Sequence, residues 1–453
     1  MGRKIQVCAL SLLGAFGYTT SAFAQVAAET PNTAAPAAPA APAVAAAPTV
    51  PPEPKTEPDV TAGPTAPAAP PIAYEPTPVA AAPAPDAPAP TGFEPLKIES
   101  KNGSASLKLG LLLQPQFETI SSPTAANEGN SNNLFVRRAR LLVGGTLFKN
   151  FEYFFETDSP NLFKADAMGQ KTGIGMNVTD AFMTWKAYED MVKFDVGYML
   201  TPGAHNALQG AGTLLGLDYF SNSFNHQFAF NTGGALVPVA GRDAGVEVRG
   251  LLLDNHIEYR AGLFQGLRKP AAAAVPPDTT GDVQAQNMFR FAGRLQINLL
   301  DAETGFFYAG TYLGKKKVAS VGAALDVQSD YVHWAVDGFL DMPVGPGVLT
   351  AQVNFSKWNG GGFTNPALAN QTAIMAEAGY IFPFPIGPIL KFEQQNFANS
   401  DAAITRIGGG VGWFPYGHNI NLKAFFTTID DKPAMGDSHT YQQAQLQGQL
   451  YFY

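Results

Sequence analysis

The end of the chain alternates between polar and apolar side chains, and this pattern restricts the possible folds more than any other feature. Glutamines occupy positions 443, 445, 447 and 449, whereas small or apolar residues occupy the alternate positions from 444 to 452. Side chains of a β-strand point alternately to its two faces, so this segment has one polar and one apolar face. A sheet that closes on itself with its apolar face outside makes all its backbone hydrogen bonds inside a membrane. Residues 441–453 therefore predict one strand of such a barrel.

The same alternation recurs along the chain in segments near the roughly ten residues that a tilted membrane strand needs. The segments are residues 104–117, 134–147, 151–158, 177–187, 191–200, 243–253, 256–265, 289–299, 317–327, 331–341, 348–357, 371–381, 388–397, 402–413, 418–428 and 441–453. We therefore predict an all-β fold, a transmembrane antiparallel β-barrel of about 16 strands. If residues 201–242 hide a strand and residues 306–312 form another, the total becomes about 18.

The predicted connections alternate in length, as expected for a barrel with both chain ends on the periplasmic side. Short connections at 148–150, 188–190 and 254–255 alternate with longer polar ones such as 119–133, 159–176 and 266–287. We interpret residues 301–316 as a long periplasmic connection. The loop 201–242 is rich in Leu, Phe and Tyr, so we expect it to fold into the pore or to pack against a neighbouring subunit.

The N-terminus has the features of a secretory signal peptide. Arg3 and Lys4 precede an apolar stretch, and Ala22, Phe23 and Ala24 form a cleavage site. We therefore predict a signal peptide over residues 1–24. The export signal and the barrel pattern together predict the bacterial outer membrane as the location of the mature chain.

The following residues 25–92 consist largely of Ala and Pro. Such a composition cannot bury a core, so we predict a disordered linker arm there. The barrel domain then occupies residues 93–453. The arm is either a passive spacer or a tether that reaches toward the cell wall.

Composition argues against several functional classes. The formal net charge of −8 does not suit a nucleic-acid partner. The single cysteine, Cys8, lies in the predicted signal peptide, so the mature chain has no disulfide and no Cys-ligated metal. The six histidines lack metal-binding spacings, and no G-x-S-x-G sequence is present. We therefore predict no metal, no cofactor and no enzymatic activity.

Basic residues on the predicted polar faces are the candidate pore-lining and anion-binding residues. They are Arg137, Arg138, Arg140, Arg249, Arg260, Arg290, Arg294, Lys391 and Arg406. Guanidinium and ammonium groups along a pore attract anions and pass them between sites. Alternatively, acids pair with these residues, which then only stabilise the wall; we expect Glu247 with Arg249, and Glu258 with Arg260, as cross-strand pairs. Both interpretations stay open from the sequence alone.

Three groups of residues resemble the phosphate-selective porin O and P family. Residues 135–141 (FVRRARL) resemble its second strand, and Asp180-Ala181-Phe182 with residues 196–202 resembles its "DAY…VGxxxTP" region. Residues 242–246 and 259–266 resemble its "RDxGV…YRxGxFNG" hairpin. The groups follow one another in the family's order, and the resemblance covers residues 104–453.

The resemblance implies a sixteen-stranded outer-membrane porin that forms homotrimers. It also implies a ladder of arginines that guides phosphate, of which Arg137, Arg138 and Arg140 match part. We expect passive diffusion of small polar or ionic solutes, with an anion or phosphate bias through luminal Arg and Lys, and with membrane lipid around the barrel. The alternative is a structural barrel tethered to the cell wall by the Pro-rich arm.

Overall fold

The computed structural model describes residues 96–123, 129–166, 169–171, 173, 175–219, 229–230, 236–237, 241–266, 289–360, 370–398 and 400–453. The predicted signal peptide 1–24 and the linker 25–92 lie outside the described residues.

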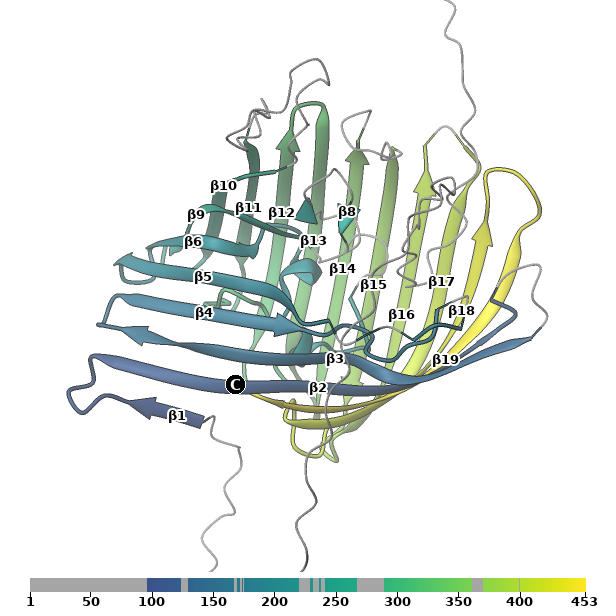
Figure 1. Ribbon diagram of the computed structural model, residues 1–453, viewed down its shortest axis with the longest axis horizontal. Helices are drawn as coiled ribbons and strands as arrows, with labels where there is room; N and C mark the ends of the chain where they lie inside the picture. Colours follow the sequence, from purple (N-terminus) through teal and green to yellow (C-terminus); the bar gives the residue numbers. More distant parts are fainter. Residues whose placement is uncertain are drawn as a thin grey trace, which may run out of the picture. The chain divides into compact units, whose positions relative to one another are not determined.

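Sixteen antiparallel strands form one closed sheet (Figure 1). They are β2 (Ala105–Ser121), β3 (Asn130–Leu147), β4 (Phe151–Asp158), β5 (Asn177–Tyr188), β6 (Val192–Leu200), β9 (Arg242–Leu252), β10 (Ile257–Phe264), β11 (Arg290–Asn298), β12 (Val318–Gln328), β13 (Tyr331–Val344), β14 (Gly347–Asn359), β15 (Gln371–Ile381), β16 (Ile386–Phe397), β17 (Ala403–Trp413), β18 (Ile420–Lys432) and β19 (His439–Phe452). Pairing of β19 with β2 closes the barrel.

Short elements accompany the barrel. Strand β1 (Leu96–Glu99) pairs with the beginning of β2. Strands β7 (Ala229–Phe230) and β8 (Leu236–Val237) form a separate two-stranded sheet. Two 3-10 helices, η1 (His205–Leu208) and η2 (Ala211–Thr213), lie between β6 and β9.

Each of the sixteen predicted segments corresponds to one barrel strand, which confirms the predicted fold. Residues 306–312 form no strand, so the total is 16 and not 18. The boundaries differ most at β2 and β3, where Ile120–Ser121 pair with Asn130–Ser131 beyond the predicted ends. These added positions are mostly polar on both faces, so they lack the alternation that identified the strands.

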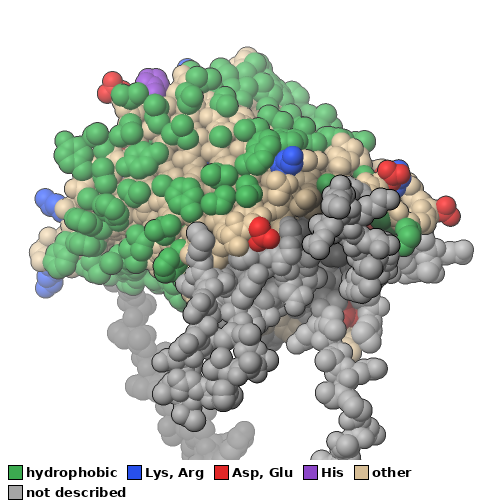
Figure 2. Space-filling view, turned by 90° about the horizontal axis from the view of Figure 1, so that it is seen from above, with side chains coloured by type: hydrophobic (Ala, Val, Ile, Leu, Met, Phe, Trp, Pro, Cys, Tyr) green, Lys and Arg blue, Asp and Glu red, His purple; other side chains and the backbone are tan. Residues whose placement is uncertain are grey.

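The outer face of the barrel is apolar and the inner face is polar. Figure 2 shows hydrophobic side chains over the face in view, with charged side chains near its edges. In β19, Leu446 and Leu450 are exposed outside, whereas Gln447 and Gln449 are buried inside the barrel. The alternation in the sequence therefore corresponds to a lipid-facing and a lumen-facing surface.

Aromatic residues near the strand ends point in both directions. Trp185 and Trp413 are exposed on the outside, where aromatic residues of outer-membrane barrels form belts at the membrane interfaces. Trp358 is fully buried and stacks on His333, and Phe154 packs against Phe307. Trp358 and Phe154 occupy strand positions that alternate in step with the polar, lumen-facing residues. Their side chains therefore point inward.

The last residue also turns inward. Tyr453 packs against Phe154, with ring centroids 5.5 Å apart. A Cβ atom at Gly144 would lie 1.9 Å from the Tyr453 hydroxyl. Only glycine at position 144 leaves room for this ring.

Two connections enter the barrel from opposite ends. Segment 203–219 follows β6, and segment 301–313 follows β11, which runs in the opposite sense. The two meet inside: the Gly210 amide donates to the Tyr308 carbonyl at 2.8 Å, and the Tyr308 amide donates to the Leu208 carbonyl at 2.9 Å. The described part of loop 201–242 thus folds into the lumen, and the predicted periplasmic connection does so as well.

Candidate functional site in the barrel lumen

All nine predicted cationic residues lie within 4.0 Å of a carboxylate. The contacts join Arg137 and Arg138 to Asp218, Arg140 to Glu156 and Asp158, Arg249 to Asp195, Arg260 to Glu258, Arg290 to Asp243 and Asp326, Arg294 to Asp337, and Lys391 and Arg406 to Glu393. The lumen wall is therefore a network of ion pairs. Solute binding by these residues stays a prediction.

A β-bulge brings Arg137 and Arg138 to one carboxylate. Gln114 of β2 pairs with Arg138 and Pro115 pairs with Val136, so Arg137 is the additional residue in β3. A bulge of this kind redirects side chains that would otherwise point to opposite faces. Both guanidinium groups thereby reach Asp218 of segment 203–219.

Asp218 accepts hydrogen bonds with both carboxylate oxygens. Its Oδ2 lies 3.0 Å from Nε and 2.7 Å from the terminal nitrogen of Arg137, and its Oδ1 lies 2.5 Å from Arg138. Asp218 is half-buried, which opposes its ionisation, but the two guanidinium groups outweigh this effect and hold its pKa far below the ordinary value. Asp218 is therefore ionised at any physiological pH.

Arg249 has a different partner from the predicted one, whereas Arg260 has the predicted partner, Glu258, but along one strand and not across two. Arg249 pairs with Asp195 on β6, and Arg260 pairs with Glu258 on its own strand. The register explains this, because Arg260 lies directly opposite Arg249 and Glu247 lies opposite Asp195. Sequence spacing alone does not give the register between strands.

Lumen cations also bind carbonyl oxygens of the two inward segments. Lys423 donates to the carbonyls of Leu214 and Gly216 at 2.6 and 2.9 Å, and Lys391 donates to those of Asp218 and Tyr219. Arg294 donates to the Gly203 carbonyl at 3.0 Å, and Arg260 to the Gly305 and Phe306 carbonyls. These cations therefore hold the segments to the wall as well as pairing with acids.

A buried contact joins the two segments at His205 and Glu303. The His205 Nε2 lies 2.8 Å from a Glu303 carboxylate oxygen, and the imidazole stacks between Tyr308 and Phe339. Burial raises the pKa of Glu303, but contacts with His205 and Tyr312 outweigh this and hold the pKa below its ordinary value. The segments are thus joined by an ionised carboxylate as well as by backbone hydrogen bonds.

Sequence reasoning missed Asp218 as a site residue. It lies in a loop with no alternation, 80 or more residues from both arginines, and no motif surrounds it. Among the described residues, no group of three or more His, Cys, Asp or Glu side chains is placed to hold a metal ion. In the described part of the chain, no helix is long and apolar enough to cross a membrane.

Comparison with known sequences agrees with the geometry. The sequence model of the phosphate-selective porin O and P family matches residues 107–234. Over this stretch the chain resembles phosphate-selective porin O and P sequences. The porin is a channel protein for solute diffusion in the bacterial outer membrane, which confirms the predicted localisation. No curated protein matches the porin significantly.

Solved structures with a similar fold share little sequence with this porin. The outer-membrane channel DcaP of Acinetobacter baumannii is 12% identical, with a TM-score of 0.49, over 80% of this chain and 99% of that one. OmpT of Vibrio cholerae lacking loop L8 is 11% identical, with a TM-score of 0.45, over 77% and 100%. Salmonella typhi OmpF in complex with daunomycin is 15% identical, with a TM-score of 0.47, over 78% and 100%.

Proposed function

We propose that this porin passes small polar and ionic solutes by passive diffusion with weak charge selectivity. The observation that carries the proposal is the pairing of all nine predicted cations with carboxylates. A pore that strongly selects anions needs an excess of positive charge along its path. Here the carboxylates offset the positive charge of the arginines and lysines. Any bias toward anions or phosphate therefore depends on sites where a cation exchanges its carboxylate for the solute.

One specific observation favours the alternative of a structural barrel. Segments 203–219 and 301–313 meet inside the lumen, and such a junction obstructs the path through the barrel. In a purely structural barrel this junction would stay closed. In a porin it leaves a narrow path or moves.

Single-channel recording of the full chain in planar bilayers separates the two functions. We expect discrete, small conductance steps and a reversal potential close to zero in a tenfold KCl gradient. Block of the current by micromolar inorganic phosphate would instead establish a phosphate-selective pathway. If the electrophoretic mobility shows that the barrel is folded but no conductance is recorded, the structural alternative is favoured.

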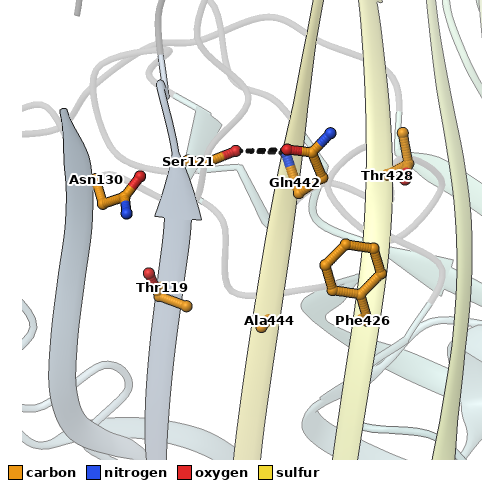
Figure 3. A pocket seen from close by; sticks show the side chains of 7 residues that line it. All are labelled: Thr119, Ser121, Asn130, Phe426, Thr428, Gln442 and Ala444. Atoms are coloured by element: carbon orange, nitrogen blue, oxygen red, sulfur yellow. Dashed lines mark hydrogen bonds between the residues drawn. The ribbon is translucent and has the colours of Figure 1, made fainter. Parts of the chain in front are cut away.

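We also propose that the porin forms homotrimers after removal of the signal peptide 1–24. A groove on the outer face, lined by Thr119, Ser121, Asn130, Phe426, Thr428, Gln442 and Ala444, supports this proposal (Figure 3). Its polar side chains lie near the strand ends, where β2 and β3 continue beyond the lipid-facing pattern, and Ser121 donates to Gln442 at 2.9 Å. A neighbouring subunit would cover these groups. Native mass spectrometry of the protein extracted from membranes measures both the subunit number and the mature N-terminus.

A further inference from the structure

Arg137 and Arg138 form a preorganised oxyanion-binding site, and the carboxylate that they bind in this structure is that of Asp218. We propose that this arginine pair binds the carboxylate of a small solute and that Asp218 is an internal competitor for the same site. The inference rests on the proposed function, because it describes how one class of solute contacts the lumen. Beyond the proposed function, the inference names the binding site, the class of its ligand and the residue that regulates binding.

The two arginines are held in place before any solute arrives. Arg138 is 2% exposed, donates to the Gln114 side chain at 2.9 Å, and lies over the Tyr219 ring. The main chain at Arg137 is fixed because its carbonyl accepts from the Asn161 amide. Two guanidinium groups with different orientations offer donors to both oxygens of one carboxylate, as Asp218 demonstrates.

Exposure distinguishes Asp218 from the other carboxylates of the arginine network. Its side chain is 41% exposed, whereas the acids that pair with Arg140, Arg249, Arg290 and Arg294 are 0–8% exposed. Those acids lie on barrel strands, but Asp218 lies on segment 203–219. A dissolved anion therefore reaches the Asp218 pair without breaking the wall.

The main chain around Asp218 is anchored independently of its carboxylate. Lys391 donates to the carbonyl oxygens of Asp218 and Tyr219 at 2.8 and 2.7 Å. Rotation of one side chain is thus enough to vacate the arginine pair while the segment stays in place. Because the internal carboxylate is tethered at high effective concentration, it weakens the binding of any competing solute.

The variant Asp218→Asn tests the proposal, since an amide keeps the shape and removes the charge. Acetate is the probe, added to the full-length porin while KCl current is recorded. We expect half-block of the current at an acetate concentration at least about tenfold lower in the variant than in the wild type. Adding Arg138→Gln to the variant should remove this gain.

Asp326→Asn is the matched control, because it removes one lumen carboxylate from Arg290 but leaves Arg290 with Asp243. It should shift the reversal potential toward anions as Asp218→Asn does, without increasing the sensitivity to acetate. Equal acetate sensitivity of Asp218→Asn and the wild type, or an equal gain in Asp326→Asn, would overturn the proposal.

A binding measurement separates this inference from the proposed function. Line broadening of ¹³C-acetate by the folded barrel in detergent reports the site even where no current flows. Stronger broadening by Asp218→Asn than by the wild type supports the site, and equal broadening contradicts it. Failure of conductance alone contradicts only the proposed function. Heat-dependent electrophoretic mobility verifies that each variant is folded.

Discussion

Segments 203–219 and 301–313 enter the same lumen from opposite ends, but different forces hold them. Charged side chains of the wall hold the first through its carbonyl oxygens and through Asp218, in addition to the packing of Leu215 in an apolar cluster with Ile389 and Phe414. Aromatic packing dominates the second, where Phe306 packs on Phe182 at 4.4 Å and Tyr308 stacks on His205. Its other contacts include donation by Arg260 to the Gly305 and Phe306 carbonyls, the pair of Glu303 with His205, and the buried hydrogen bond of Thr311 with Asp341.

The two segments should therefore respond differently to solutes and salt. Ionic contacts weaken as salt rises or as another ion competes for them, whereas buried apolar contacts do not. We therefore expect the ionic contacts of segment 203–219, such as that of Asp218, to change during solute passage, with segment 301–313 as the fixed support against which the segment packs. Three substitutions or conditions test this comparison.

The largest effect is expected from Tyr308→Ala. Tyr308 is 1% exposed and lies between His205 and Arg260, so its removal leaves a cavity where the two segments meet. The free energy of unfolding should fall by about 3–5 kcal/mol, as for other large buried rings. Denaturant titration of the barrel in lipid vesicles measures this. Tyr308→Phe keeps the ring and should cost far less; an equal loss would mean that the hydroxyl, and not the packing, anchors the segment.

A pH effect of smaller size is expected at His418. This residue lies in the turn between β17 and β18, and its Nε2 donates to the Thr311 carbonyl at 2.9 Å. Burial lowers the pKa of His418 to about 4. Because the folded pKa lies below the unfolded value near 6.5, stability is complete above pH 6.5 and is lost as pH falls toward 4, by up to about 3 kcal/mol.

Thermal unfolding measured between pH 7.5 and 4 by electrophoretic mobility detects the loss. The variant His418→Gln retains an N–H donor and cannot titrate, so its unfolding temperature should vary less over this range. An identical pH profile in the variant would assign the effect to other groups.

The smallest of the three effects is expected from Lys423→Met. The ammonium group is the donor to the carbonyls of Leu214 and Gly216, and methionine fills a similar volume without donating. We expect a loss of about 2 kcal/mol, because buried carbonyls lose their hydrogen bonds, together with larger current noise from a looser segment 203–219. Lys149→Met, at an exposed turn, is the control. If the current noise of Lys423→Met equals that of the wild type, segment 203–219 is as rigid as segment 301–313 without this contact, and the comparison is wrong.

Most of the barrel follows from the sequence because strand alternation is a local property. Residues 289–299 and 441–453 showed both faces directly, and each forms a strand with the expected face outside. The ends of β2 and β3 were missed because pairing continues there without a lipid-facing pattern. The sequence also does not indicate how far segments 203–219 and 301–313 reach into the lumen, apart from their unusual content of apolar residues.

The cations of the site were predicted individually, but their partners were not. Arg137 and Arg138 meet Asp218 because of a bulge and a loop that folds back across the barrel. Arg249 pairs with Asp195 because of the register between β6 and β9. Both are long-range geometric facts, which a single sequence does not contain.

The seam between β2 and β19 has a consequence for how the chain folds. There the Gln114 side chain donates to that of Gln449 at 2.8 Å across 335 residues of sequence. Contacts of such sequence separation form late and slowly, because loop-closure entropy must be lost before they stabilise anything. Until β19 joins β2, both strands expose an unpaired edge, which invites pairing with other chains. Correct assembly therefore depends on keeping these two edges apart from other chains until the last strand is synthesised and delivered.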